Sequence, residues 1–274
     1  MTGRLVLVAT PLGNLADLQP RAISVLTTAD AIACEDTRMT GKLLGLAGVP
    51  GRPMLAVHAH NEASMVDAVL ARLERGETVA VVSDAGLPGI SDPGERLVRA
   101  AADAGYPVSV VPGPSAGVAA LVISGLPTGR WVFEGFLPRK GRDRADRLAA
   151  IAAEPRTAVL YEAPHRIRAT IADLAAACGP ERRVALVREL TKLHEEVWRG
   201  TLGAATSIER EPRGEYVVVV EGAPPAAAVT DDEVEHALAG WLAGGADRRT
   251  AVAEVAAALG VPKRRVYDAC LRLP

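Results

Sequence analysis

Three polar, glycine-rich turns each follow a short apolar run in the first half of the chain. They are TPLGN at 10–14, SDAGLPGISDPG at 83–94 and PGPSAG at 112–117. Glycine lets a backbone approach a ligand closely, and the N–H groups of a helix that begins after PGPS would point at a bound group. The second turn is longer than a strand needs to reach the next helix. These turns therefore predict a ligand site rather than plain connections.

Several common ligands are disfavoured by missing motifs. The first turn lacks G-x-G-x-x-G and the chain has no G-x-x-x-x-G-K-[ST], which argues against NAD and ATP. His58, His60, His165 and His194 are scattered without H-E-x-x-H spacing, so no metal site is predicted. Three cysteines without a C-x-x-C pair indicate free thiols in a reducing cytoplasm and argue against a thiolate zinc site.

Length and composition indicate a globular protein. The chain has 274 residues, of which 49% are hydrophobic and 23% charged, enough for two ordinary domains and a small third. No apolar run reaches the roughly 18 to 20 residues that span a bilayer, and the N-terminal run leads into a glycine turn rather than a signal-peptide cleavage site. The net charge is −2, so any contact with nucleic acid must come from local basic patches.

The elements that must position the turns form an alternating series. In the first 125 residues, short apolar runs alternate with stretches whose apolar residues have helical spacing. This alternation predicts a parallel α/β sheet covered on both faces. Ligands of such sheets bind outside the carboxyl ends of the strands, so all three turns should lie at one edge. The predicted strands are 4–9, 31–35, 54–57, 78–82 and 107–111, and the predicted helices are 20–29, 37–46, 62–75, 93–104 and one after PGPS.

The second half predicts a mixed sheet followed by helices. Its late strands follow one another with little helix between them, which favours antiparallel pairing. The predicted strands are 131–136, 157–162, 183–190, 195–200 and 215–222, with helices near 142–153 and 166–177. After a Pro/Ala linker at 222–232, the tail predicts three short helices. The stretch 251–269 fits a helix-turn-helix and a plain docking bundle equally well. The expected domains are 1–125, 126–222 and 230–274.

Six motifs in a fixed order identify a family resemblance over essentially the whole chain. They are LVLVATPLGN with its continuation to CEDTR, HNE at 60–62, VSDAGLPGISDPG, VPGPSA, FEGFLP and LYEAPHR. Together they resemble the bacterial 16S ribosomal RNA cytidine 2′-O-methyltransferases, a branch of the tetrapyrrole methylase superfamily. The resemblance implies two α/β domains with S-adenosylmethionine folded into the cleft between them, in a cytoplasmic homodimer. It also implies a target cytidine in the decoding region of the assembled small ribosomal subunit.

The same resemblance implies which residues bind the cofactor. Ser115 and Ala116 would hold its methionine end, and Glu162 and Leu190 would lie near the adenosine. An aspartate after a strand is otherwise a turn former or a helix cap, and the motif match favours ligand contact for Asp84. The remaining expected contacts are Leu12, Ser83, Ala85 and Leu87.

The expected substrate directs attention to charged residues that follow strands. A ribose hydroxyl needs a proton acceptor, or a cation that stabilises the developing alkoxide. Lys192 could act in either way, with Glu189 as its partner or as the base, and Asp36 of CEDTR is the next candidate. Each could also be a plain solvated loop residue. RNA contacts are expected from Arg38, His60, Asn61, Arg139, Lys140 and Arg166.

Two other classes of function remain open at this point. A methylase of a corrin or porphyrin would share the fold, but the chain has only nine aromatic residues for a planar apolar pocket, and it lacks the G-x-G-P-G-D pattern of the corrin and sirohaem enzymes. A non-catalytic protein that binds DNA through its tail would leave the three turns without a purpose.

Overall fold

The computed structural model describes residues 2–58, 60–209, 211–225 and 229–273. They fall into two compact units, Met1–Ala223 and Pro224–Pro274, and each unit is described by itself. Within the described ranges, no helix is both long and apolar enough to cross a membrane.

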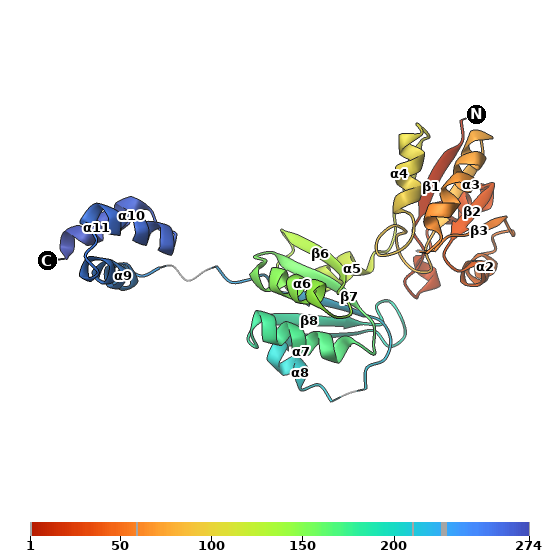
Figure 1. Cartoon of the computed structure of the whole chain (residues 1–274). Helices are drawn as coiled ribbons and strands as arrows, with labels where there is room; N and C mark the ends of the chain where they lie inside the picture. Colours follow the sequence, from red (N-terminus) through yellow and green to blue (C-terminus); the bar gives the residue numbers. More distant parts are fainter. Residues whose placement is uncertain (1, 59, 210, 226–228, 274) are drawn as a thin grey trace. The chain divides into compact units, whose positions relative to one another are not determined.

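The first sheet, of which Figure 1 labels β1, β2 and β3, is parallel throughout, as the sequence predicts. Its strand order is β3-β2-β4-β1-β5, so the chain reverses its direction of winding after β3. Because both faces are covered, the strands are almost wholly apolar rather than alternating. The strands are β1 (Arg4–Val8), β2 (Ala31–Cys34), β3 (Met54–Ala56), β4 (Thr78–Val82) and β5 (Val108–Val111).

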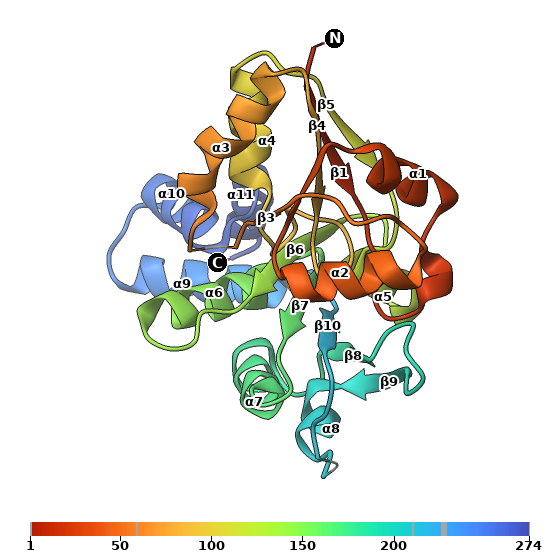
Figure 2. The ribbon, with the colours of Figure 1, turned by 90° about the vertical axis from the view of Figure 1, so that its right-hand side faces the viewer.

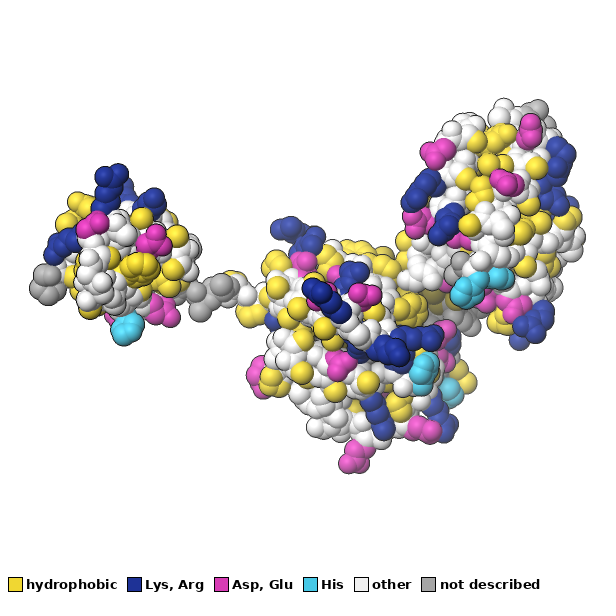
Figure 3. All heavy atoms as spheres, viewed as in Figure 1, with side chains coloured by type: hydrophobic (Ala, Val, Ile, Leu, Met, Phe, Trp, Pro, Cys, Tyr) yellow, Lys and Arg dark blue, Asp and Glu magenta, His cyan; other side chains and the backbone are white. Residues whose placement is uncertain are grey.

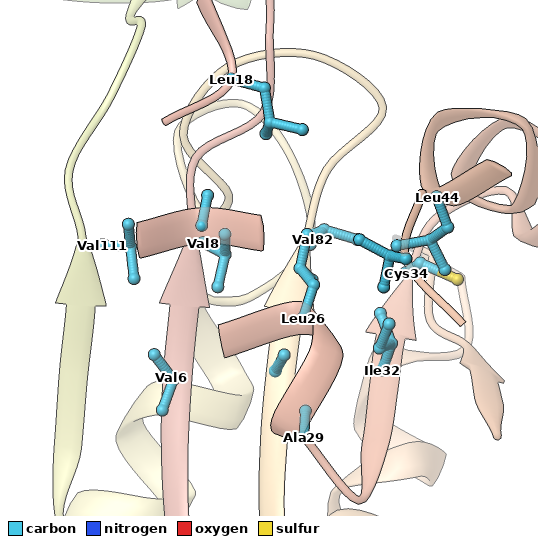
Figure 4. Close-up of a cluster of buried hydrophobic side chains, with 13 residues drawn as sticks. Val6, Val8, Leu18, Leu26, Ala29, Ile32, Cys34, Leu44, Val82 and Val111 are labelled. Atoms are coloured by element: carbon cyan, nitrogen blue, oxygen red, sulfur yellow. The ribbon is translucent and has the colours of Figure 1, made fainter. Parts of the chain in front are cut away.

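Two helices cover each face of this sheet. Figure 2 shows α3 (Glu62–Glu74) and α4 (Glu95–Asp103) on one side and α1 (Pro20–Thr28) on the other, the side that α2 (Thr37–Leu46) shares. On the α1 side, Leu26 and Leu44 pack against alternate strand residues such as Val8 and Ile32 (Figure 4). The predicted helices are thus confirmed. The structure adds one short 3₁₀ turn, η1 (Leu15–Asp17), within the first glycine-rich segment.

The second sheet is mixed, which confirms the predicted antiparallel pairing. Its order is β6-β7-β10-β8-β9, with β6 parallel to β7 and every other neighbouring pair antiparallel. The strands are β6 (Trp131–Phe136), β7 (Thr157–Glu162), β8 (Arg183–Arg188), β9 (Glu196–Thr201) and β10 (Tyr216–Val220). One face carries α6 (Arg142–Ala153), α7 (Ile167–Cys178) and the short α8 (Leu202–Thr206), which the sequence did not reveal.

Helix α5 (Ala116–Ser124) covers the other face of the second sheet. Although it directly follows β5 of the first sheet, its buried Ala120 and Leu121 pack against the valines of β8 and β10. Its sequence, AGVAALVIS, is apolar nearly all round, so it can be buried in either layer. The guanidinium of Arg199 on β9 donates to the carbonyl of Ser124 at 3.0 Å and so fixes the C-terminal end of the helix.

The second unit is a bundle of three helices, α9 (Asp231–Ala243), α10 (Arg248–Leu259) and α11 (Lys263–Arg272), and each contacts the other two. A capping box between Thr230 and Glu233 begins α9, and Gly260 ends α10 with φ +62°. The bundle buries its own apolar core and is tied by Arg265 to Asp231 at 2.8 Å.

Candidate cofactor pocket and catalytic rim

The three glycine-rich turns meet at the carboxyl end of the first sheet, as the sequence predicts. Thr10 and Gly86 exchange two backbone hydrogen bonds of 2.8 and 3.1 Å, which join the first turn to the second. A Cβ on Gly113 would lie 2.7 Å from the Cβ of Ala9, so the third turn packs against the end of β1 only because residue 113 is glycine.

The long turn 83–94 is shaped from inside by a buried glutamate. Glu62, the last residue of HNE, is 7% exposed, and its carboxylate accepts the backbone N–H groups of Gly94 and Arg96, each at 2.9 Å. It therefore caps α4 from another helix, where Gly94, at φ +139°, has no side chain to do so. Sequence reasoning missed this role, because a cap supplied from 32 residues away leaves no local signal.

Residues of both sheets line a cavity of about 560 Å³ beside these turns. This volume suits a cofactor-sized ligand. Of the nine expected cofactor residues, eight line it: Leu12, Asp84, Ala85, Leu87, Ser115, Ala116, Glu162 and Leu190. Ser83 is not among the described residues of this wall. It lies beneath the turn, where its hydroxyl is 3.3 Å from the carbonyl oxygens of Ala85 and Gly86. The structure therefore gives Ser83 a supporting position.

The charge of this cavity is one-sided. None of its described lining residues is Lys or Arg, but five of them are carboxylates. These are Glu35, Asp84, Asp92, Glu162 and Glu215. Glu162 has an ion pair with Arg166 at 3.3 Å, and Glu215 has one with Lys192 at 2.8 Å. The other three carboxylates have no ion pair with any Lys or Arg that the structure describes. The negative charge is therefore left for a ligand to balance.

The three unpaired carboxyls hold their protons more tightly than usual. Burial raises the pKa of Asp92 to about 6, and the charges of Glu35 and Asp84 add to this effect. Burial also raises the pKa values of Glu35 and Asp84, with a contribution from the neighbouring carboxylates. A cation in the cavity would reverse these effects, since an opposite charge favours the ionised form of a carboxyl.

Hydrogen bonds across the pocket fix its walls. The hydroxyl of Tyr161 accepts the N–H of Gly117 in the first turn of α5 at 3.0 Å. Asp84 accepts the N–H of Asp36 at 3.3 Å, which links the ends of β4 and β2. The hydroxyl of Thr170 donates to the buried Glu162 at 2.6 Å. The walls are thus held in position by the protein itself.

Lys192 lies at the rim of the pocket. It lines a second hollow that shares Leu12, Asp84 and Glu215 with the cofactor cavity. Its Nζ atom is 2.8 Å from Glu215 and 3.0 Å from Glu189. Burial lowers its pKa, but the hydrogen bonds and charges of these two carboxylates outweigh burial and raise it above the ordinary value. Lys192 is therefore a cation at neutral pH.

Two glycines make room for this arrangement. A Cβ on Gly13 would lie 2.3 Å from Cγ of Lys192, and a Cβ on Gly214 would lie 2.3 Å from Oε1 of Glu189. Glu189 itself has φ +50° and accepts the N–H of Glu215 at 3.0 Å. Burial raises its pKa, yet this N–H and Lys192 together lower it below the ordinary value. Glu189 is thus placed to orient Lys192.

Asp36 has a structural position. Its carboxylate caps α2 by accepting the N–H of Arg38 at 2.8 Å, and it also pairs with the Arg38 guanidinium at 2.8 Å. The hydrogen bonds from Arg38 lower the pKa of Asp36 to about 2. So acidic a group is a poor proton acceptor near neutral pH.

The residues expected to contact RNA divide into two groups. Arg38, His60, Arg139 and Lys140 are exposed, and Arg38 is 89% exposed at its side chain. The other two are engaged in the fold: Asn61 donates to the carbonyl of Ala56 at 3.0 Å, and Arg166 donates to that of Leu137 at 2.7 Å. On the face shown in Figure 3, basic and acidic side chains are interspersed.

Several lining residues were missed from the sequence. Asp92 lies in the turn SDAGLPGISDPG. The Ser-Asp pair at 91–92 repeats the pair at 83–84, and this repeat is a signal that could have identified Asp92. Tyr161 and Glu215 gave no such signal, since Tyr161 precedes Glu162 on a buried strand and Glu215 immediately precedes β10.

The arrangement of two α/β layers around one cavity defines the class of protein, the tetrapyrrole methylases. Residues 4–206 match the family model for tetrapyrrole (corrin/porphyrin) methylases. Similar solved structures include diphthine synthase, with a TM-score of 0.63 at 13% identity, covering 80% of this chain and 90% of that one. Uroporphyrin-III-C-methyltransferase from Thermus thermophilus has a TM-score of 0.56 at 20% identity, covering 83% and 99%. At these identities the likeness shows the fold alone.

Curated relatives are much more similar in sequence. The protein named "Ribosomal RNA small subunit methyltransferase I" in Synechocystis sp. is 46% identical over 99% of this chain and 98% of its own length. The protein of that name in Mycobacterium tuberculosis is 46% identical over 99% of this chain and 95% of its own. The chain therefore belongs to the tetrapyrrole methylase family, in the group whose curated members carry this name.

S-adenosylmethionine is the cofactor of this chain, and the described residues fit it. The positive sulfonium suits a cavity in which three carboxylates lack a basic partner among the described residues, and the N-terminus of α5 can receive a carboxylate. The aromatic rings of Tyr161 and Phe136 and the aliphatic Leu12 and Leu190 provide apolar surface for the remainder.

Proposed function

We propose that the protein methylates the ribose 2′-hydroxyl of a cytidine in the decoding region of 16S ribosomal RNA, within the assembled small subunit. The names of its curated relatives support ribosomal RNA of the small subunit as the substrate. The observation that carries the proposal is a carboxylate-lined cavity beside a lysine that the fold keeps protonated. Action on ribosomal subunits would place the protein in the cytoplasm.

The reaction requires alignment, charge stabilisation and removal of one proton. The bound cofactor supplies a methyl group on a sulfonium. Transfer of this methyl group to the hydroxyl oxygen would leave a neutral thioether, so the chain's own residues would have to align the hydroxyl and accept its proton. The rigid turns around Asp84 and Leu87 hold the reactants in line, and such alignment contributes about 7–11 kcal/mol to catalysis.

Lys192 supports the reaction as a cation rather than as a base. A neutral amine would need a lowered pKa, whereas the carboxylates around Lys192 raise it. Its ammonium can stabilise the oxygen as the hydroxyl proton leaves. Glu189 orients the ammonium of Lys192 by accepting a hydrogen bond from it at 3.0 Å. Glu215 lines both hollows and touches Lys192 at 2.8 Å, so we assign it the role of proton acceptor.

A corrin or porphyrin methylase remains the second candidate only through the shared fold. Such macrocycles carry carboxylate side chains, and the unpaired carboxylates of this cavity would repel them. The curated relatives also favour RNA.

The homodimer and the docking of the tail are further parts of the proposal. Val110 on β5 and Val118 and Val122 on α5 are 45–67% exposed, which gives apolar surface for a second copy. In the tail, Arg265 is paired with Asp231, while Lys263 and Arg264 are exposed and can reach phosphates.

A methyl-transfer assay with labelled cofactor tests the main proposal. Assembled small subunits should accept one methyl group, and the modified nucleotide should resist alkaline cleavage at its 3′ side, because its 2′-oxygen is blocked. Free 16S RNA and a uroporphyrin-type macrocycle serve as comparison substrates. Methylation of a base would contradict the ribose assignment, and activity on the macrocycle alone would favour the second candidate.

A further inference from the structure

A second cavity, of about 650 Å³, lies on the face of the second sheet opposite to α5. It is at the end of β10 that borders the cofactor pocket. Tyr216 lines both cavities, so they are neighbours. Most of the lining residues are apolar, and they come from α7, β8, β9, β10, α8 and the segment that follows α8. The apolar ones include Ile167, Ile171, Leu186 and Trp198. The charged lining residues are Arg168, Arg188, Glu196 and Glu209.

One charged side chain stands out among these walls. The side chain of Arg188, the last residue of β8, is only 10% exposed and lines the cavity. Its Nε–H has no hydrogen-bond partner in the described structure, and Glu196 lies 3.6 Å from Nε, beyond a normal hydrogen bond. A buried donor left unsatisfied costs free energy, so a ligand with an acceptor would be favoured there.

The strand pairing places Tyr216 directly beside Arg188, and it places Trp198 diagonally across from Arg188 on the same face of the sheet. Arg188 is paired with Tyr216 on β10, and Leu186 is paired with Trp198 on β9, so all four side chains belong to one face of the sheet. A Cβ on Gly200 would lie 2.6 Å from Cη2 of Trp198, which shows that the indole ring lies over this glycine.

We propose that this cavity receives a nucleobase of the RNA substrate that flanks the target nucleotide. The inference rests on the proposed function, since it assumes an RNA substrate. A base offers a flat π-face for the aromatic rings and edge acceptors for the guanidinium, whereas a simple anion would not need apolar walls. Guanine fits best, because its O6 and N7 atoms accept both donors of an arginine. The shared Tyr216 puts this subsite next to the reacting centre.

The variant Arg188→Met tests the subsite, with Arg183→Met as a matched control. Arg183 begins the same strand and also has a carboxylate, Glu221, at 3.6 Å, but it does not line the cavity. We expect Arg188→Met to lower kcat/KM for small subunits about 10- to 100-fold, with the dissociation constant of S-adenosylmethionine within about twofold of the wild type. Equal kcat/KM values for the two variants would overturn the subsite.

Ultraviolet cross-linking of the unaltered protein to small subunits covers the case in which Arg188→Met does not fold. Mass spectrometry should find nucleotide adducts on Trp198 or Tyr216, and adducts confined to other residues would refute the proposal. The two proposals also fail differently. A wild type that does not methylate subunits would contradict the proposed function. A wild type that methylates them without these adducts would contradict the subsite alone.

Discussion

The rim around Lys192 and the floor of the cofactor cavity adjoin one another, but charged groups are paired at the rim and unpaired on the floor. At the rim, Lys192 is neutralised by Glu189 and Glu215. Asp36, whose N–H donates to Asp84, is neutralised by Arg38. On the floor, Asp84 and Asp92 have no basic partner among the described residues, and burial raises their pKa values. The protein therefore completes its own charges where groups must be held in position, and leaves charge uncompensated where we propose that the cationic cofactor binds.

The largest expected effect concerns the rim. Replacing Lys192 by Met should lower the single-turnover methylation rate about 10²- to 10³-fold, because the variant loses the cation that stabilises the developing oxyanion. The affinity for S-adenosylmethionine should change little. Lys42→Met is the control, since Lys42 is an exposed lysine of the same hollow. Similar rates in the two variants would remove Lys192 from the mechanism.

A second expected effect concerns Asp92, on the floor of the cavity, and the pH dependence of the folding stability of the protein. Below about pH 4, Asp92 is protonated in both the folded and the unfolded chain. Between about pH 4 and 6 the unfolded chain loses this proton while the folded chain keeps it, so stability falls as pH rises. Asp92→Asn removes this loss. The cofactor-free variant should be more stable than the wild type by about 1–2 kcal/mol at pH 8, after allowance for solvent screening, and equally stable near pH 3. Urea denaturation at both pH values measures the difference.

The pH dependence of cofactor binding sharpens the comparison. A bound cation favours ionised Asp92, so binding should release a proton below pH 6, where the group is still protonated. Affinity for S-adenosylmethionine should rise with pH, by at most about tenfold per unit for this group, and level off above pH 6. Calorimetry in buffers of different ionisation enthalpy detects the proton. In Asp92→Asn this dependence should be weaker, and an unchanged pH profile would contradict the assignment.

The smallest expected effect is that of Asp36→Asn. Asn is a good N-cap, so α2 should begin at the same residue, and the low pKa of Asp36 means that it stays ionised throughout the working range. Methylation rate and cofactor affinity should remain close to those of the wild type. A loss of rate of about 100-fold, as expected for removal of a general base, would return Asp36 to the mechanism.

Most of the fold could be predicted from the sequence, because apolar periodicity reports local structure. The strands and helices of both sheets, the antiparallel pairing in the second sheet and the meeting of the three turns all followed from it. The short helix α8 was missed because five residues are too few to show a helical period. The position of α5 on the second sheet was missed because a helix that is apolar all round does not indicate which layer it covers.

The candidate site was only partly visible, for a related reason. The sequence determined which glycines shape the turns and, through its motifs, eight of the residues that line the cavity. Only the tertiary structure decided which charges are paired. It placed Lys192 between Glu189 and Glu215, gave Glu62 the task of capping α4 and left Asp92 buried without a cation. Ionisation depends on burial and on charges within a few ångströms, and residues so close in space are often distant in sequence.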